Sequence, residues 1–526
     1  MQRLFILLLM IVFYALSSYS QTIAPSVQWR TVVGGREIES AYYVRQTLDG
    51  GYISVTTTCS ADRDMLDHHG DTNTYDGFIV KLSSSGSVDW KFSFGDTLDN
   101  RLFDVIQASD GGYIAVGSTY QSYGEIYGGY QTFNFWVLKL NADGSIAWKN
   151  QYGGSAAEYA LSVCQTKDGG YAMVGWTDSY DADVIGHHGA RDYWLVRIDP
   201  LGKMLWSKCY GGPGTDFPYM VKNTKDNGFI MIGTSESMSG DIKNPWGEKD
   251  IWVVKTDSLG TLEWERSIGG SGTEFSNCIE PTSDGGYILS GETGSTDGDI
   301  PSHLFSGNLL VTKLGSKGET QWIKRYGGSS NDGSKCIRQL INGSYVVSVL
   351  TYSVDGDFKV PDPSHQQWKH GLVGLSQDGE LTWQMFFNDT IHYIDNFDYT
   401  PDGGFVLSGH IGNPENPTVV DIDMCIVKLG KMQSGVTNSN TITPEDVFSI
   451  SSNPLTESTT ISLTNPIQTD GSFNVYNSLG SLIYYKDLTA TELVFTLHRD
   501  MFVAGSYQCI LRNGKGVVAT STLIVE

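Results

Sequence analysis

Charged side chains, and basic ones above all, are scarce in this sequence. Only 18% of the residues are charged, and 35 Lys and Arg face 59 Asp and Glu, giving a net charge of −24. Nucleic acids and anionic membrane surfaces both require a basic face on the protein that binds them. We therefore expect no nucleic-acid partner. Cations and basic partners remain compatible with the charge.

Long apolar runs are also missing after the amino terminus, so we expect no integral membrane segment. Residues 1–20 are typical of a secretory signal, with Arg3 at the start, an apolar run from Leu4 to Ala15 and small residues from Ser18 to Ser20. No cysteine follows directly, which disfavours a bacterial lipoprotein. The sequence thus predicts a secreted or cell-surface protein.

Helical periodicity and known catalytic motifs are absent as well. There is no G-x-S-x-G, no H-E-x-x-H and no phosphate-cradling glycine motif. What the chain has instead is glycine, at 61 residues, and aromatic residues, at 12%. That composition suits short strands joined by tight turns.

A motif of the type Asp-Gly-Gly-Tyr returns at a nearly constant spacing. Its aromatic residue steps by 61, 58, 58, 58, 58 and 60 residues at Tyr52, Tyr113, Tyr171, Phe229, Tyr287, Tyr345 and Phe405. A tryptophan keeps a similar period at Trp29, Trp90, Trp148, Trp206, Trp264, Trp322 and Trp383. A fixed period in this range indicates one supersecondary unit repeated and stacked on itself.

One repeat is enough to predict the unit. Strands are expected at 158–165, 171–177, 192–198 and 203–210, with a polar loop from Asp178 to Arg191 between the second and the third. Four antiparallel strands in seven units predict an all-β fold, a seven-bladed β-propeller spanning residues 22–430. The seventh unit lacks a tryptophan strand, so we expect Ser26–Gly35 to complete it and close the ring.

The seven cysteines are odd in number and form no CxxC pair. Cys164, Cys278 and Cys336 are interpreted as occupying matching points of three repeats. Small buried core positions carrying free thiols are favoured over a disulfide framework.

Residues 431–446 are predicted to be a linker, and 447–526 a separate small β-sandwich. This tail resembles the type A C-terminal sorting domain of the type IX secretion system of Bacteroidetes-type bacteria. The resemblance rests on Asn453-Pro454, on Val475 to Gly480, on Ala504-Gly-Ser-Tyr507 and on the final apolar strand. It departs from the family pattern at Asn477, where Asp is usual, and at Thr520, where a Lys commonly precedes the last strand. It implies type IX export machinery as a partner through residues 447–526; a merely adhesive sandwich is the other interpretation.

Two sets of loop residues are candidates for a binding site. The first set lies four residues after each glycine pair, mostly as acids, at Glu39, Asn100, Glu158, Asp216, Glu274 and Asp332. These residues either form a polar collar that binds a cation or ligand, or accept hydrogen bonds from their own glycine turns. Glu158, Asp216 and Glu274 are retained as candidate ligand-binding residues.

The second set is aromatic, acidic and histidine residues of the longer loops. Exposed Trp176, Trp246 and Trp368 could stack on sugar rings or could form loop cores. Asp181, Asp183 and His187 are the candidate ligands for Ca²⁺ or another divalent metal, against an interpretation as a recurring Asx-type loop. No other cofactor is expected.

The preferred prediction is a non-catalytic propeller that binds an extracellular glycan or protein. The alternatives are a polysaccharide-degrading enzyme, a glycoside hydrolase or lyase using loop acids and histidines, and a structural part of a surface assembly.

Overall fold

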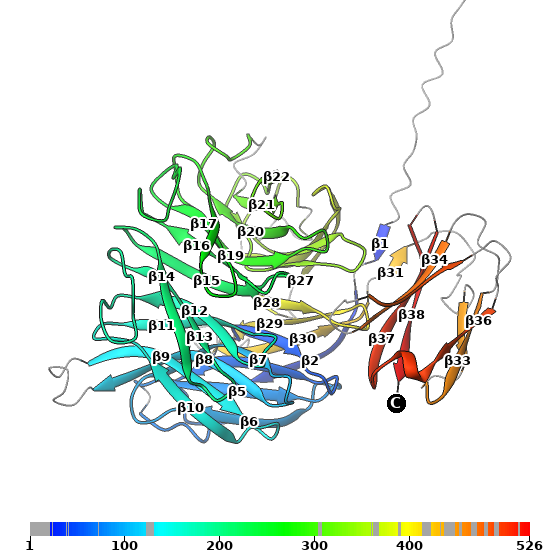
Figure 1. The fold of residues 1–526 in the computed structure, drawn as a ribbon, viewed down its shortest axis with the longest axis horizontal. Coiled ribbons are helices and arrows are strands. Elements are labelled where there is room, and N and C mark those ends of the chain that lie inside the picture. The colour runs from blue at the N-terminus through cyan, green and yellow to red at the C-terminus, as the bar shows by residue number, and fades with distance from the viewer. Residues whose placement is uncertain are drawn as a thin grey trace, which may run out of the picture.

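The computed structural model describes residues 21–525 apart from 24, 38, 40, 72, 123–130, 303–307, 359, 361–367, 388–390, 413–421, 432, 436–447, 452–454, 464–470, 478–481, 489–493 and 514–515. The chain is all-β, with seven sheets arranged as the blades of a propeller and a smaller pair of sheets at the carboxyl end (Figure 1). The predicted fold class is confirmed. The predicted signal, residues 1–20, lies outside the described residues.

Each of the first five blades is built from four consecutive strands. Blade 1 contains β3 (Tyr43–Gln46), β4 (Tyr52–Thr58), β5 (Asp76–Leu82) and β6 (Val88–Phe94). Blade 2 contains β7 (Asn100–Gln107), β8 (Tyr113–Ser122), β9 (Gln131–Leu140) and β10 (Ile146–Tyr152). Blade 3 contains β11 (Glu158–Gln165), β12 (Tyr171–Thr177), β13 (Asp192–Ile198) and β14 (Met204–Tyr210). The strands predicted for this repeat agree with these bounds to within one residue.

Blades 4 and 5 follow the same plan, and blade 6 departs from it. Blade 4 contains β15 (Asp216–Asn223), β16 (Phe229–Ser235), β17 (Asp250–Thr256) and β18 (Leu262–Ile268). Blade 5 contains β19 (Glu274–Pro281), β20 (Tyr287–Thr293), β21 (Leu309–Leu314) and β22 (Thr320–Tyr326). In blade 6 the inner strand is divided into β23 (Asp332–Gly333) and β24 (Ile337–Gln339), which both pair with β25 (Tyr345–Thr351), ahead of β26 (Lys369–Leu375) and β27 (Leu381–Phe387).

The ring closes through the chain's first long strand, as predicted. Blade 7 contains β28 (Tyr393–Tyr399), β29 (Phe405–Gly412) and β30 (Ile422–Leu429), and its fourth strand is β2 (Val27–Val33). β2 lies antiparallel to β30, with Trp29 opposite Lys428 and Val33 opposite Met424. Because β2 fills this edge, the last blade has no unpaired strand there.

The Asp-Gly-Gly turns do more than reverse the chain. In blade 2, Asp110 accepts a hydrogen bond from the Gly112 N–H at 2.9 Å, and Gly111 adopts φ +84°. The same carboxylate pairs with the buried Lys139 of the third strand at 2.9 Å. Equivalent ion pairs recur in five other blades, at Asp49–Lys81, Asp168–Arg197, Asp226–Lys255, Asp284–Lys313 and Asp402–Lys428. The motif therefore recurs because its acid fixes both the turn and a buried cation.

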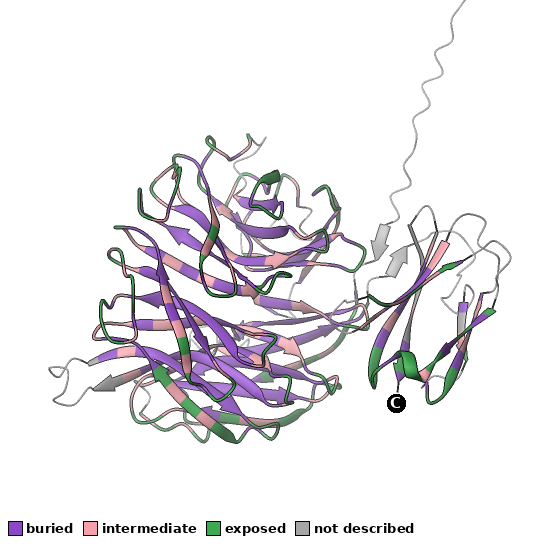
Figure 2. Cartoon of the chain, viewed as in Figure 1, coloured by how far each residue is buried: buried purple, intermediate pink, exposed green. Residues whose placement is uncertain are grey.

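The repeating tryptophans hold neighbouring blades together. Trp90 of blade 1 packs edge-on against Tyr113 of blade 2, with ring centroids 5.7 Å apart. Similar contacts join Trp29 to Tyr52, Trp206 to Phe229, Trp264 to Tyr287 and Trp322 to Tyr345. The two sequence markers are thus the two sides of one interface between blades. Figure 2 shows the blade strands as mostly buried.

The cysteine prediction needs one correction. All seven cysteines are buried, and the structure holds none of them in a disulfide. Cys278 follows the bulge of its inner strand directly, as Ser162 does in blade 3, whereas Cys164 stands two residues further along. Cys164 therefore does not share the position of Cys278 and Cys336; near-equal spacing to the next turn concealed the offset.

The carboxyl-terminal sheets form a sandwich with its own core. One sheet contains β32 (Phe448–Ser451), β33 (Ser458–Leu463) and β36 (Val494–His498). The other contains β34 (Gly471–Asn477), β35 (Leu482–Leu488), β37 (Gly505–Asn513) and β38 (Gly516–Val525), and a short 3-10 helix, Arg499–Met501, lies between β36 and β37. Apolar side chains from both sheets form one cluster, which includes Phe473, Phe495 and Leu511.

The predicted linker lies largely outside the described residues. Its described part includes β31 (Gln433–Gly435), which pairs with β1 (Gln21–Ile23) at the start of the described chain. Within the described residues, no helix combines the length and apolarity needed to span a membrane.

Candidate functional site

The acids that follow the glycine pairs are buried caps. Glu274 is fully buried; its carboxylate accepts the Gly270 N–H at 3.0 Å and the Thr293 hydroxyl at 2.7 Å. The same two kinds of donor serve Glu39, Glu158 and Asp332, while Asp216 accepts the Gly212 N–H and the Ser237 hydroxyl. In the structure, these acids accept hydrogen bonds from their own glycine turns, which is the second of the two interpretations, rather than forming an open polar collar. Glu158, Asp216 and Glu274 therefore present no open carboxylate for a ligand.

Burial affects how two of these caps ionise. It raises the pKa of Glu158 to about 7, although Ser179, Gly154 and Thr177 donate hydrogen bonds that favour the charged form. It likewise raises the pKa of Asp216 to about 6, against donors of the same kind. Desolvation thus outweighs hydrogen bonding at both positions.

Trp176 is a loop core and not an exposed platform. One face of its ring stacks on Tyr159, with centroids 4.6 Å apart, and the guanidinium of Arg191 lies 3.6 Å from its centroid. The ring is 8% exposed. Since sugar stacking requires a free face, the structure removes Trp176 from the candidate platforms.

Trp246 and Trp368 are exposed, as expected, but in different settings. Trp246 is 51% exposed and donates its indole N–H to Asp299 of the next blade at 3.0 Å. Trp368 is 46% exposed and stands edge-on to Tyr352, with centroids 5.3 Å apart. Of the two, only Trp368 lines one of the hollows described below.

The predicted metal ligands are directed to other partners. Asp181 accepts the Ser155 N–H at 2.8 Å, and Asp183 accepts the Gly153 N–H at 3.2 Å. His187 bonds the Thr177 carbonyl at 3.1 Å and packs edge-on against Tyr180. These contacts fasten the loop to the neighbouring glycine turn. Over the described residues, no three His, Cys, Asp or Glu side chains converge in a way that could hold an ion.

An aromatic belt, which the sequence analysis missed, runs along the start of the inner strands. Ring centroids lie 5.5 Å apart for Tyr42 and Phe103, 6.2 Å for Phe103 and Tyr159, and 6.0 Å for Trp176 and Phe217. The signal was present in the sequence, because Tyr159, Phe217 and Phe275 each directly follow a capping acid. The belt brings aromatic side chains of blades 1 to 4 together on the face that carries the long loops.

Blade 6 interrupts this pattern and opens a cleft. Gly333 stands where the preceding blades carry Phe275, Phe217 and Tyr159, each directly after the capping acid. A Cβ at Gly333 would collide with the carboxylate of Glu292 in blade 5. The cleft beside it has a volume of about 290 Å³ and is lined by Thr273, Phe275, Glu292, Thr293, Gly294, Asn308, Asn331, Asp332, Gly333, Leu350 and Trp368.

The lining of this cleft combines aromatic surface with a few polar groups. Phe275 is 38% exposed and lies directly across the strand pair from Glu292. Burial raises the pKa of Glu292, partly offset by the charge of Lys335. Asn308 is held in place by the hydrogen bond that its side chain donates to the Thr293 carbonyl at 2.8 Å. Concave, partly apolar hollows with a few convergent polar groups are the usual form of ligand sites.

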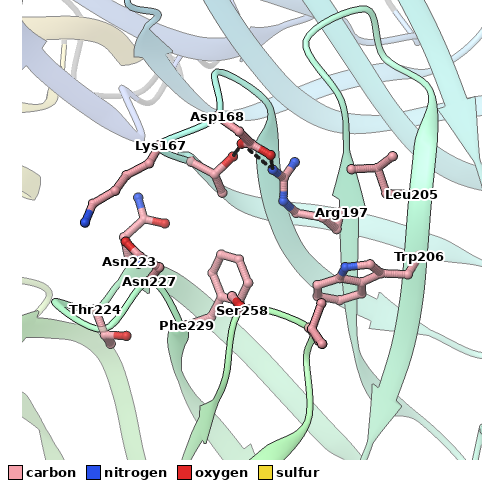
Figure 3. Close-up of a pocket in the computed structure, with 12 residues that line it drawn as sticks. Lys167, Asp168, Arg197, Leu205, Trp206, Asn223, Thr224, Asn227, Phe229 and Ser258 are labelled. Carbon is pink, nitrogen blue, oxygen red and sulfur yellow. Dashed lines mark hydrogen bonds and ion pairs between the residues drawn. The ribbon is translucent and has the colours of Figure 1, made fainter.

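A larger hollow lies on the opposite face, between blades 3 and 4 (Figure 3). Its volume is about 560 Å³, and Trp206, Phe229, Asp168 and Arg197 contribute to its lining. Figure 3 shows Asp168 bonded to Arg197 above the two rings, and the ion pair measures 2.5 Å. Both contacts recur in other blades: the tryptophan that packs on the aromatic residue of the next blade, and the ion pair between the turn acid and a buried cation. The residues that line this groove make the same contacts that join other pairs of blades. We therefore do not treat it as a candidate ligand site.

Comparisons with known proteins give distant structural likenesses. No protein-family model matches the chain, and no curated protein matches it. Among solved structures, a protein from Lactobacillus plantarum is similar at 12% identity and TM-score 0.39, over 80% of this chain and 95% of the other. Puromycin hydrolase is similar at 10% identity and TM-score 0.44, over 85% and 62%, and Sqt1 from Chaetomium thermophilum at 12% and 0.35, over 78% and 100%.

Proposed function

We propose that this protein is a non-catalytic binding protein, and that the cleft between blades 5 and 6 takes part of an extracellular carbohydrate chain. The observation that carries the proposal is the pairing of two half-exposed rings, Trp368 and Phe275, with the carboxyl of Glu292 in one hollow. Sugars offer apolar C–H faces to aromatic rings and hydroxyls to carboxylates and amides. Asn308 and Asn331 supply the amides.

The size of the cleft favours a small ligand unit over a protein surface. At about 290 Å³ it is at the lower end of small-molecule sites, which run from roughly 300 Å³ upward. A protein partner would instead require a patch of about 800 Å² on each side. One or two sugar residues of a longer chain fit the volume of the cleft.

The arrangement of acids favours binding over hydrolysis. Glycoside hydrolysis ordinarily needs two carboxyl groups flanking the scissile bond. Two acids, Glu292 and Asp332, line the cleft. Asp332 already accepts the Gly328 N–H at 2.9 Å and the hydroxyl of Ser353 at 3.0 Å. Glu292 alone is then available, and a single acid suits recognition of hydroxyls.

The test is a glycan array followed by calorimetry with the oligosaccharide it selects. Trp368→Ala and Glu292→Gln should each weaken binding by at least about tenfold. Trp246→Ala is the matched control, since it removes an equally exposed tryptophan from another part of the same face, and it should leave the affinity unchanged. Unchanged affinity in both cleft variants would refute the site. Release of new reducing ends from the oligosaccharide would favour the enzyme alternative.

We further propose export by type IX machinery that reads residues 447–526, with delivery outside the outer membrane. The sequence resemblance supports this, together with a tail that forms its own core. A reporter with residues 1–20 at its start and residues 431–526 at its end should reach the medium or cell surface of a type IX-competent bacterium. The same fusion ending at Met501, which lacks β37 and β38, should stay inside the cell. Equal export of both fusions would contradict the proposal.

A further inference from the structure

In six of the seven blades, a buried side chain occupies an equivalent position on the inner strand. It stands directly after the strand bulge, at Asp104, Ser162, Met220, Cys278, Cys336 and Asn396. Asp104 accepts the Val163 N–H of the next blade at 3.0 Å, and Ser162 accepts the Val221 N–H at 3.3 Å. Cys278 accepts the Ile337 N–H in the same way, at 3.3 Å. The position therefore fastens blade 2 to blade 3, blade 3 to blade 4 and blade 5 to blade 6.

Between blades 5 and 6, two successive members of this ring are cysteines. The Sγ atoms of Cys278 and Cys336 are 3.7 Å apart, and both side chains are fully buried. The guanidinium of Arg338 donates to Cys278 Sγ at 3.3 Å. Cys164, by contrast, contacts the side-chain oxygen of Asn223 at 3.4 Å.

We propose that Cys278 and Cys336 form a disulfide that joins blade 5 to blade 6. The two sulfurs need to approach by less than 2 Å to reach bonding distance, about 2.05 Å. The bond is independent of the proposed ligand and of the export route. It makes this junction covalent, where other blades rely on hydrogen bonds.

The docked junction makes the two thiols unequal. Burial opposes ionisation of Cys278, but the thiol of Cys336, the charge of Arg338 and the Ile337 N–H together lower its pKa. The pKa of Cys336 is raised instead, by burial and by its neighbour. These groups belong to blade 6, so they act on Cys278 only in the docked ring; before docking, the exchange can begin from the thiolate of either cysteine.

The oxidant is a low-molecular-weight disulfide such as oxidised glutathione. When Cys278 reacts first, its thiolate attacks one glutathione sulfur and forms a mixed disulfide, and the other glutathione leaves as thiolate. Cys336 loses its proton to solvent and attacks the Cys278 sulfur, which releases the second glutathione. One disulfide is consumed, one is formed and two thiols are produced. Because both sulfurs are buried in the folded ring, this exchange takes place before blades 5 and 6 have docked.

The junction also includes an inner strand that is held by a short ladder. The inner strand of blade 6 is divided into β23 and β24, with only two and three residues. The intact inner strands of blades 2 to 5 have eight residues each. Fewer ladder hydrogen bonds hold this strand, and a bond from Cys336 to Cys278 ties it to the stronger neighbour.

The experiment is refolding in a glutathione redox buffer, followed by thiol counting and peptide mapping under denaturing conditions. The expected result is two fewer free thiols than in the reduced protein and a peptide pair linked through Cys278 and Cys336. Reduction should lower the melting midpoint by several degrees. Cys278→Ser and Cys336→Ser should remove this redox dependence, and Cys164→Ser should retain it.

If either Ser variant fails to fold, mapping of the wild-type protein still decides the matter. All seven thiols remaining free after oxidation, or a linked pair other than this one, would overturn the proposal.

Discussion

Closure of the propeller depends on a strand that no hairpin turn tethers to its sheet. β6 of blade 1 is joined to β5 by a short turn, but β2 reaches β30 from the far end of the chain. Trp29→Ala removes the ring that packs on Tyr52 at 5.2 Å. We expect this change to undock β2 and to expose the edge of blade 7.

The magnitude follows from the area that the ring buries. A fully buried tryptophan contributes about 4–6 kcal/mol at ~25 cal/mol/Å². Trp29 is half-buried, so its loss should cost about 2–3 kcal/mol, a fall of about 2–4 °C in the melting midpoint of a propeller of about 400 residues. Trp90→Ala is the matched control. It loses a half-buried ring on the equivalent tyrosine, at 5.7 Å, from a tethered strand.

Hydrogen exchange separates the two variants. In Trp29→Ala, the amides of Met424 to Leu429 on β30 should exchange faster, because their partner strand leaves. In Trp90→Ala, the amides of Gly77 to Leu82 on β5 should stay protected, because the turn returns β6 to its place. Equal protection of both partner strands would refute the reasoning that the ring is closed by docking alone.

Three further predictions concern pH, the cleft and the tail. Between pH about 4.5 and 7 the folded protein holds a proton at Glu158 that the unfolded chain releases, so stability should fall as pH rises through this window. In thermal melts, the melting midpoint of Glu158→Gln should depend less on pH than that of the wild type. An equal dependence on pH in both proteins would contradict the burial argument. Gly333→Ala places a Cβ against Glu292 and should abolish oligosaccharide binding in calorimetry while circular dichroism stays unchanged; full affinity would count against the cleft. Removing residues 447–526 should leave the melting midpoint of the propeller within about 2 °C of the full chain, because the tail has a core of its own, and a larger fall would indicate a shared one.

The repeat made most of the fold predictable. The acid of the Asp-Gly-Gly turn recurs because every blade needs that turn to be fixed. The tryptophan recurs because every blade packs against the next one through it. The first tryptophan strand, with Trp29, precedes the first turn motif, and no tryptophan strand follows the last one. This mismatch was enough to predict that the first strand closes the ring. In the tail, no repeat marks where each strand begins and ends.

The candidate site was harder to predict, because a side chain can contact a ligand only where it is exposed, and the sequence does not show which loop residues are buried. Glu158 and Trp176 have the residue types of a ligand site, yet a glycine turn occupies one and an arginine covers the other. Glu292 was missed because it is one acid among many, and it gains its setting only from Gly333 of the next blade. Among the residues predicted from the sequence, Trp368 and Asp332 line the cleft, and Asp332 is occupied there as a turn cap.

The most direct test of the proposed site is a crystal structure of the protein with the oligosaccharide selected by the array. The account predicts a sugar ring against Trp368, with hydroxyls bonded to Glu292 and Asn308. Density in the groove between Trp206 and Phe229, or on Trp246, with the cleft between blades 5 and 6 empty, would contradict it.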